Sequence, residues 1–283
     1  MELAGAIPGV SAGSVNDILL LEAGRRPLAR LSCTVGCLPD IEDAVQRLGL
    51  ASRRWRHRIE PVQTVAANAG YVIAARPVTE TEKSDSGHRT FLFVARDEAL
   101  ADLAEGFAAN DVMLGALFGY PSCCVQAFVI NRSHYMVHLQ PAFAIEGGLT
   151  LPFWSNTMVD AFGWHLVSHF PCSAQCQPTR DMALSNWAAL AEVDPAHATA
   201  TLVHMRSVVL LNSDLGLAYG SKLPLGDGRY CVHVLGASTE WLQAFGDQSR
   251  IEVRPDGTIY NNNSPLPSTT SIFDFTGNAD GAG

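Results

Sequence analysis

The stretch Gly119-Tyr-Pro-Ser-Cys-Cys-Val-Gln-Ala-Phe128 lies where one predicted helix ends and the next begins. Gly119 suits the left-handed residue that often follows a helix, and Pro121 suits the first turn of a new one. Upstream, apolar residues recur at helical spacing from Leu100 to Leu117. This pattern predicts a helical centre, residues 95–200, that carries the cysteines of the chain.

The region before this centre has a different pattern. Residues 1–94 alternate short apolar runs with turns, which predicts a small α/β N-terminal lobe. Strands are expected over residues 18–21, 29–35, 71–75 and 90–95. The segment 39–48 places Ile41, Val45 and Leu48 on one face, which predicts a helix capped by Asp40.

After the centre, short alternating runs separated by Gly-Asp-Gly and Pro-Asp-Gly turns predict a β-rich C-terminal portion over residues 201–262. Residues 263–283 are dominated by Asn, Ser, Thr, Pro and Gly, and a flexible tail is expected there. The fold class is therefore expected to be α+β.

Bulk properties limit the classes of partner. The formal charge of −9 argues against general nucleic-acid or anionic-membrane binding, because either partner would be repelled. We see neither a signal peptide nor an apolar run long enough to cross a membrane. A cytoplasmic protein with a small-molecule substrate is expected.

The chain has seven cysteines, an odd number. Six form three close pairs and one stands alone: Cys33/Cys37, Cys123/Cys124, Cys172/Cys176 and Cys231. In a reducing compartment, paired thiols are more often metal ligands or redox groups than structural disulfides. The lone Cys231 is expected to be buried in the core.

Cys123 and Cys124 are expected in the first turn of the helix after Pro121. Free backbone N–H groups and the helix dipole stabilise thiolates there. Adjacent side chains on a helix point about 100° apart. Cys124 is therefore the preferred metal ligand of the pair, and Cys123 is a further candidate ligand that otherwise packs beside the site.

The segment His169-Phe-Pro-Cys-Ser-Ala-Gln-Cys176 repeats the order aromatic, proline, cysteine. If residues 172–176 form one helical turn, Cys172 and Cys176 share a face. His165 and His169 are four residues apart and would converge on the same site. We expect Cys124, Cys172 and Cys176 as ligands, and His169 as a fourth ligand or, with His165, as a catalytic acid or base.

The sequence constrains the identity of the metal less than it constrains the identity of the ligands. A radical-SAM cluster needs Cys-x3-Cys-x2-Cys, but Thr179 stands at the third position after Cys172/Cys176, and Asp40 after Cys33/Cys37. Three thiolates on a [4Fe–4S] cluster would leave one iron open to substrate, whereas three thiolates and a histidine also suit tetrahedral Zn²⁺. We favour the [4Fe–4S] cluster, with Zn²⁺ as the alternative.

The two cysteine segments resemble an uncharacterised prokaryotic family, a domain of unknown function with Gly-Tyr-Pro-x-Cys-Cys and Pro-Cys-Ser-x-x-Cys motifs. The resemblance covers roughly residues 97 to 190. It rests on Gly119, Tyr120, Pro121, Cys123, Cys124, His169, Pro171, Cys172, Ser173 and Cys176. It implies a shared site but no known reaction.

Other candidate residues have simpler interpretations. His134 and His138 have the spacing of a helical metal pair but are expected on the surface, and Glu146 and Asp160 are expected to be solvated or capping. Cys33/Cys37 is expected in core or turn packing, and it is a further candidate for a fourth ligand. The basic run Arg53–Arg58 is expected to form a solvated face, although Trp55 within it can stack on a ring.

The sequence thus predicts a metal-dependent, cluster-containing enzyme that performs elimination, sulfur transfer or desulfurisation on a small metabolite or modified amino acid. Two alternatives stay open: a zinc-stabilised binding or accessory protein, and a thiol-redox protein. The alternative without a functional centre is that the same cysteines are buried structural thiols or a reducible disulfide. The sequence contains no phosphate-binding loop, serine-hydrolase elbow or dinucleotide fingerprint.

Overall fold

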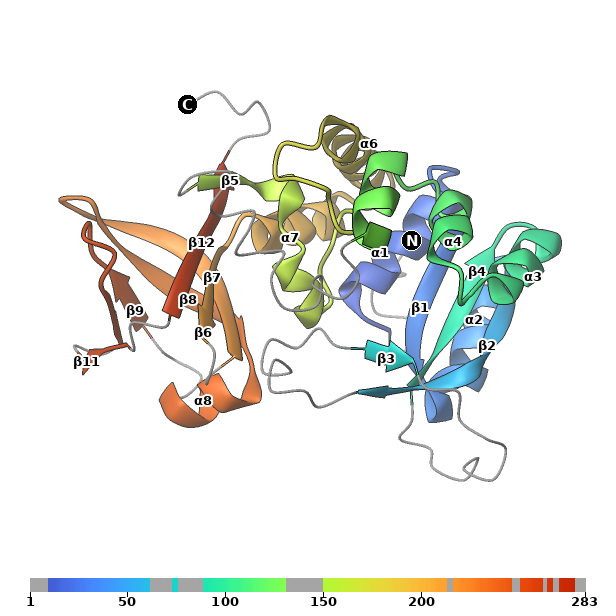
Figure 1. The fold of residues 1–283 in the computed structure, drawn as a ribbon, viewed down its shortest axis with the longest axis horizontal. Coiled ribbons are helices and arrows are strands. Elements are labelled where there is room, and N and C mark those ends of the chain that lie inside the picture. Colours follow the sequence, from blue (N-terminus) through green and yellow to red (C-terminus); the bar gives the residue numbers. More distant parts are fainter. Residues whose placement is uncertain are drawn as a thin grey trace.

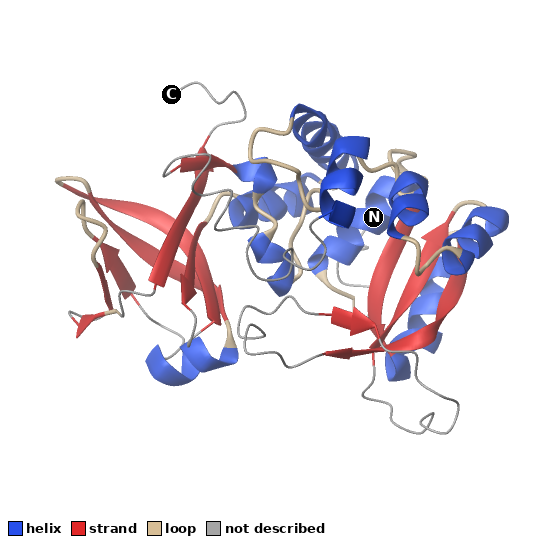
Figure 2. Ribbon diagram, in the orientation of Figure 1, coloured by secondary structure: helices blue, strands red, loops and turns tan. Residues whose placement is uncertain are grey.

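The computed structural model describes residues 10–61, 73–75, 89–130, 150–212, 216–245, 250–261, 264–266 and 270–277. A four-stranded sheet lies at one end of the molecule, a curled eight-stranded sheet lies at the other, and helices fill the space between them (Figures 1 and 2). The expected α+β fold is confirmed. No helix in the described part of the chain combines the length and the apolar character needed to cross a membrane.

The smaller sheet is antiparallel and has the order β1-β4-β2-β3. Its strands are β1 (Leu28–Thr34), β2 (Ala51–Pro61), β3 (Ile73–Ala75) and β4 (Arg89–Ala95). Successive residues of β4 point to opposite faces, and both faces are buried. Leu92 and Val94 pack on one side with α2 (Leu38–Arg47), while Phe93 and Ala95 pack on the other with α3 (Glu98–Gly106).

Residues 18–21 are helical, so the strand expected there is wrong. They belong to α1 (Ala12–Glu22), whose N-cap residue Ser11 accepts a hydrogen bond from the Ser14 backbone N–H. Leu21 packs against the smaller sheet, whereas Leu20 packs into the central core. All residues from Gly13 to Leu21 are buried, so the apolar run over residues 18–21 shows no alternation between a buried and an exposed helix face.

The helical centre contains α4 (Asp111–Leu117), a helix whose described part covers residues 122–130, α6 (Gln177–Val193) and α7 (Pro195–Met205). Short 3-10 helices occur at Val35–Cys37, Phe153–Ser155 and Met158–Phe162. The main core joins α1, α6 and α7 to the larger sheet through Trp154, Leu190 and Phe273. Asp40 lies in the first turn of α2, but Cys37 occupies the N-cap position and forms no side-chain cap.

The larger sheet has the order β11-β10-β9-β8-β7-β6-β12-β5. Its strands are β5 (Thr150–Pro152), β6 (Val208–Asn212), β7 (Gly216–Gly226), β8 (Arg229–Ala237), β9 (Arg250–Val253), β10 (Ile259–Asn261), β11 (Ser264–Pro265) and β12 (Thr270–Gly277), with α8 (Thr239–Phe245) after β8. The β-rich C-terminal portion therefore extends past residue 262.

The flexible tail expected over residues 263–283 is wrong for residues 264–266 and 270–277. Strand β12 lies inside the sheet, antiparallel to β6 and parallel to β5. Phe273 and Phe275 are buried in the central core. Polar neighbours hide this short apolar alternation, and only pairing with distant strands shows that the segment is structural.

Candidate metal centre

Four thiols from two distant segments converge in the helical centre. The sulfur atoms of Cys123, Cys124, Cys172 and Cys176 all lie within 4.8 Å of one another, and all four cysteines are free. The Sγ–Sγ distances are 3.5 Å for Cys124 and Cys176, 3.8 Å for Cys123 and Cys176, and 3.9 Å for Cys123 and Cys124. This group can hold a metal ion.

The first segment has the local structure that its sequence predicts. Helix α4 ends at Leu117, and Gly119 follows with a left-handed φ of +72°. The carbonyl of Pro121 then accepts hydrogen bonds from the backbone N–H groups of Cys124 and Val125, at 2.9 and 3.0 Å. Both cysteines therefore lie in the first turn of the helix that begins at residue 122.

The two adjacent thiols share one site, although only one of them was expected to face it. Their side chains leave the helix in different directions, but rotation about χ1 brings the sulfur atoms together. Cys123 completes the group of four, and neither Cys33 nor Cys37 belongs to it. Cys33 is buried in β1 and Cys37 is half-buried after it.

The second segment differs from the prediction. Residues 172–176 do not form a turn of helix. They form a non-helical turn, with a 3.2 Å hydrogen bond from the Cys176 N–H to the Ser173 carbonyl. Helix α6 begins only after Cys176, with Pro178 in its first turn. The proline that starts the helix is thus Pro178, whereas Pro171 precedes the turn.

Thr179 connects the thiols to a histidine. Its hydroxyl lies 3.2 Å from Cys124 Sγ, 3.3 Å from Cys176 Sγ and 2.9 Å from His169 Nε2. The side chain is fully buried. Sequence reasoning missed this residue because a threonine at position 179 was considered only as a departure from the radical-SAM spacing.

His169 contacts the site through Thr179, and the group of four close ligands contains only cysteines. Burial lowers the pKa of His169 to about 3, with a further contribution from the positive charge of Arg26. The ring is therefore neutral at pH 7. Its Nδ1 atom is buried and has no hydrogen-bond partner.

The thiols differ in their ease of ionisation. Burial raises the pKa of Cys124, and it raises the pKa of Cys172 to about 11. Burial also acts on Cys176, but the hydrogen bonds from Thr179, Cys124 and Cys172 together outweigh it and lower the pKa of this thiol. Cys176 is thus more easily deprotonated than Cys124 or Cys172, and thiolate is the form that binds a cation.

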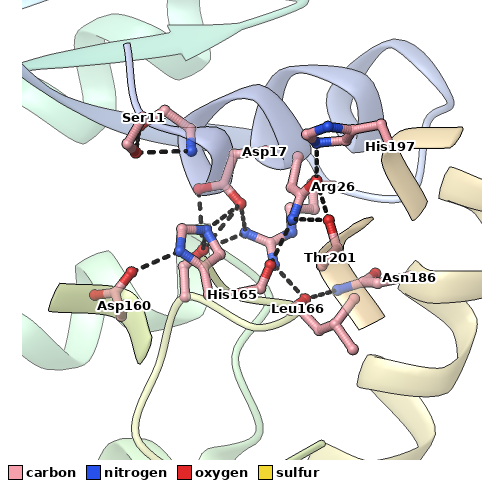
Figure 3. A network of polar contacts seen from close by, with 12 residues as sticks. Ser11, Asp17, Arg26, Asp160, His165, Leu166, Asn186, His197 and Thr201 are labelled. Atoms are coloured by element: carbon pink, nitrogen blue, oxygen red, sulfur yellow. Dashed lines mark hydrogen bonds and ion pairs between the residues drawn. The ribbon is translucent and has the colours of Figure 1, made fainter. Parts of the chain in front are cut away.

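His165 does not reach the thiols and belongs to a separate buried network (Figure 3). Its Nδ1 lies 2.7 Å from Asp160 and its Nε2 lies 3.1 Å from Asp17. Asp17 also pairs with Arg26 and accepts hydrogen bonds of 2.9 Å from the Ser168 hydroxyl. Residues 165–169 are not helical, so the four-residue spacing does not bring the two histidines together.

The arrangement of Ser168, His165 and Asp160 resembles a Ser-His-Asp triad, with Ser168 Oγ 3.1 Å from His165 Nε2. The charges oppose that function. Burial lowers the pKa of His165, but Asp17 and Asp160 outweigh it and raise the pKa to about 10. A protonated imidazole cannot accept the serine proton, and the Ser168 hydroxyl is already bound to Asp17.

This network holds the main chain that leads to the thiols. The side chains of Asn16 and Asn186 donate to the carbonyls of His165 and Leu166, at 2.7 and 2.8 Å. Arg26 donates to the Leu166 carbonyl as well. Hydrogen bonds from α1, α6 and Arg26 therefore hold the segment that leads to His169 and Cys172, and Figure 3 shows those that Arg26 and Asn186 donate to Leu166.

A cavity of about 110 Å³ lies beside the thiols. Cys124 and His169 form part of its wall, together with Arg30 from β1 and Asp111 and Gly115 from α4. A Cβ atom at Gly115 would lie 2.7 Å from Val125, so glycine allows α4 and the helix at residues 122–130 to approach closely.

The remaining candidates lie away from this centre or outside the described residues. Arg53, Arg54 and Arg56 pair with acidic side chains of α2 and α3, and Trp55 stacks on Phe91. Cys231 is buried, as expected. His134, His138 and Glu146 lie outside the described residues.

Comparisons of the chain with protein-family models, with curated proteins and with solved structures find no match.

Proposed function

We propose that this chain is a metalloprotein in which Cys123, Cys124, Cys172 and Cys176 bind a single Zn²⁺ ion. The observation that carries the proposal is the spacing of the sulfur atoms, 3.5 to 3.9 Å for the three pairs among Cys123, Cys124 and Cys176 and at most 4.8 Å for all four. In a tetrahedron with Zn–S bonds of about 2.3 Å, the sulfur atoms lie about 3.8 Å apart. The thiols are thus spaced as ligands of one ion.

A [4Fe–4S] cluster fits this spacing less well. Each thiolate would then bind a different iron, and the sulfur atoms would stand farther apart than around one ion. The cluster-dependent elimination, sulfur-transfer and desulfurisation reactions are therefore the second candidate. One observation favours that candidate, because Cys124 lines a cavity and places the centre within reach of a small molecule.

The proposed role of the zinc is to hold the helical centre together. A zinc site with four cysteine ligands has no open coordination position and usually stabilises a fold. Here it would join the helix at residues 122–130 to the turn before α6, and 47 residues of chain lie between Cys124 and Cys172. The functional surface would then be the cavity whose wall includes Cys124.

Metal analysis of protein purified without oxygen tests this proposal. We expect one zinc per chain, no inorganic sulfide and no absorbance near 400 nm. Cys176→Ser should lose the metal, because it removes the ligand closest to two others. Cys37→Ser is the matched control and should keep it.

The other outcomes identify the rival functions. A brown protein with matching iron and sulfide would replace the zinc proposal with the iron–sulfur candidate. A metal-free protein whose four thiols oxidise reversibly would replace it with the thiol-redox candidate. Zinc retained by Cys176→Ser would show that the ion binds elsewhere.

A further inference from the structure

We propose that Cys123 and Cys172 are a modification site, at which a hydroperoxide forms a disulfide and releases the zinc ion. This regulation rests on the proposed zinc centre, because oxidation of the pair removes two of the four ligands. It follows from how the four thiols differ in exposure. Each of the two segments that form the centre contributes one half-buried cysteine and one buried cysteine.

The outer pair, Cys123 and Cys172, is the part of the centre that solvent reaches. Both residues are half-buried, whereas the inner pair, Cys124 and Cys176, is only 1% and 5% exposed. The susceptibility of a thiolate to oxidation follows its exposure. A small peroxide therefore reaches the outer pair before it reaches the inner pair.

The inner pair is also protected by a buried hydroxyl group. The Thr179 hydroxyl lies 3.2 Å from Cys124 Sγ and 3.3 Å from Cys176 Sγ. Within the described part of the chain, its only other contact of this kind is with His169, at 2.9 Å. A hydrogen bond to a thiolate stabilises its charge and makes it a weaker nucleophile. Exposure and hydrogen bonding thus select the same pair for oxidation.

The reaction consumes one hydrogen peroxide for each disulfide. One outer thiolate attacks the O–O bond, which gives a sulfenic acid and one hydroxide ion. The second outer thiolate then attacks the sulfenic sulfur and displaces a second hydroxide ion as the S–S bond forms. The two sulfur atoms lose two electrons in total, the peroxide gains both, and the zinc remains Zn²⁺.

The geometry suits a bond between the two segments. All four sulfur atoms lie within 4.8 Å of one another, so rotation about χ1 can bring Cys123 and Cys172 together. The adjacent Cys123 and Cys124 are poor partners, because consecutive Cα atoms are about 3.8 Å apart and disulfides need about 4.4–6.8 Å. The new bond joins the same two segments as the zinc does. The fold is therefore retained, while the two remaining thiolates are too few to keep the ion.

Oxidation of the intact, zinc-loaded protein tests this regulation. Zinc is measured first, and hydrogen peroxide is then added in the presence of a zinc-binding dye. We expect loss of the whole zinc content, with one zinc released for each peroxide consumed. Mass spectrometry after alkylation of the remaining thiols should find Cys123 joined to Cys172, with Cys124 and Cys176 alkylated. A dithiol reductant and added zinc should restore the metal.

Two variants test whether exposure selects the pair. Cys37→Ser removes a half-buried thiol outside the centre, and peroxide should release its zinc as in the wild-type protein. Cys176→Ser, which should lose the metal, should still form the disulfide between Cys123 and Cys172, because both outer thiols remain. Circular dichroism shows whether each variant keeps its fold. If Cys176→Ser does not fold, the disulfide found in the wild-type protein decides.

The two proposals fail in different ways. Zinc that stays bound after peroxide treatment, or a disulfide that involves Cys124 or Cys176, would overturn the regulation and leave the zinc centre standing. A folded Cys176→Ser variant without the outer disulfide would also overturn it. Absence of zinc before oxidation would overturn the proposed function, and the proposed release of zinc with it.

Discussion

Replacing Asp17 with asparagine should destabilise this protein severely. The carboxylate is buried between Arg26 and His165, with side-chain exposures of 3%, 6% and 11% respectively. Asparagine keeps the shape but removes the counter-charge of the buried Arg26, and it leaves His165 with the half-exposed Asp160 as its remaining carboxylate partner. Breaking a buried ion pair by removing one partner typically costs about 3–5 kcal/mol, and we expect Asp17→Asn to lie in that range.

Asp160→Asn is the matched control. Asp160 contacts the same imidazole at 2.7 Å, but its side chain is 50% exposed, so solvent screens the interaction. We expect this variant to lose about 1 kcal/mol or less. Denaturant unfolding at pH 7, with the free metal concentration held constant, gives both values, and equal losses in the two variants would refute the reasoning.

The contact between Asp17 and His165 also predicts how the free energy of unfolding depends on pH. The pKa of His165 is raised from 6.5 to about 10, so its contribution to stability is complete below pH 6.5 and is lost as the pH rises toward 10. The pKa of Asp17 is lowered from 3.8 because Arg26 and His165 outweigh its burial, so its contribution is lost as the pH falls below that value. Asp17→Asn should flatten the alkaline decline relative to Asp160→Asn, and unchanged profiles would contradict the assigned charges.

Three further predictions concern the metal centre, the helix contact and the last strand. Thr179→Val should weaken zinc binding by about 10 to 100-fold in competition with a chelator, whereas Thr179→Ser should retain it, because the hydroxyl holds two ligands. Gly115→Ala should destabilise by about 1–3 kcal/mol, since its Cβ would meet Val125, while Gly106→Ala, with open space around it, should not. Phe273→Ala in β12 should lower the free energy of unfolding by about 3–5 kcal/mol, whereas Ser271→Ala, at an exposed position, should lower it by less than about 0.5 kcal/mol. Equal losses in the two variants would contradict a structural role for this segment.

Local features of the sequence were sufficient to predict the elements whose structure depends only on neighbouring residues. Gly119 and Pro121 predict the end of α4 and the start of the next helix, and both are found there. The apolar runs of β1 and β4 predict strands that the structure confirms within a residue or two. Such signals act within a few residues, so no tertiary information is needed.

The errors arise where distant contacts decide the structure. The apolar run in α1 is helical because both the central core and the smaller sheet cover it. Strand β12 is specified by its pairing with β6, more than fifty residues earlier in the chain. The residues of α1 and of β12 do not by themselves indicate which distant elements will pack or pair with them.

The centre was predicted in part. Its four cysteines are the ones selected from the sequence, but the roles of the histidines were tied to a helical spacing that residues 165–169 do not adopt. Thr179 was missed because a threonine gives no metal-ligand signal. Its contacts with Cys124 and His169 depend on the turn before α6, which the sequence suggested would be helical.

X-ray absorption at the zinc edge tests the central claim most directly. We expect one zinc per chain, surrounded by four sulfur atoms at about 2.3 Å and by no nitrogen or oxygen ligand. Bound iron with iron–iron scattering, or zinc with fewer than four sulfur neighbours, would contradict the assignment of Cys123, Cys124, Cys172 and Cys176 to a single zinc ion.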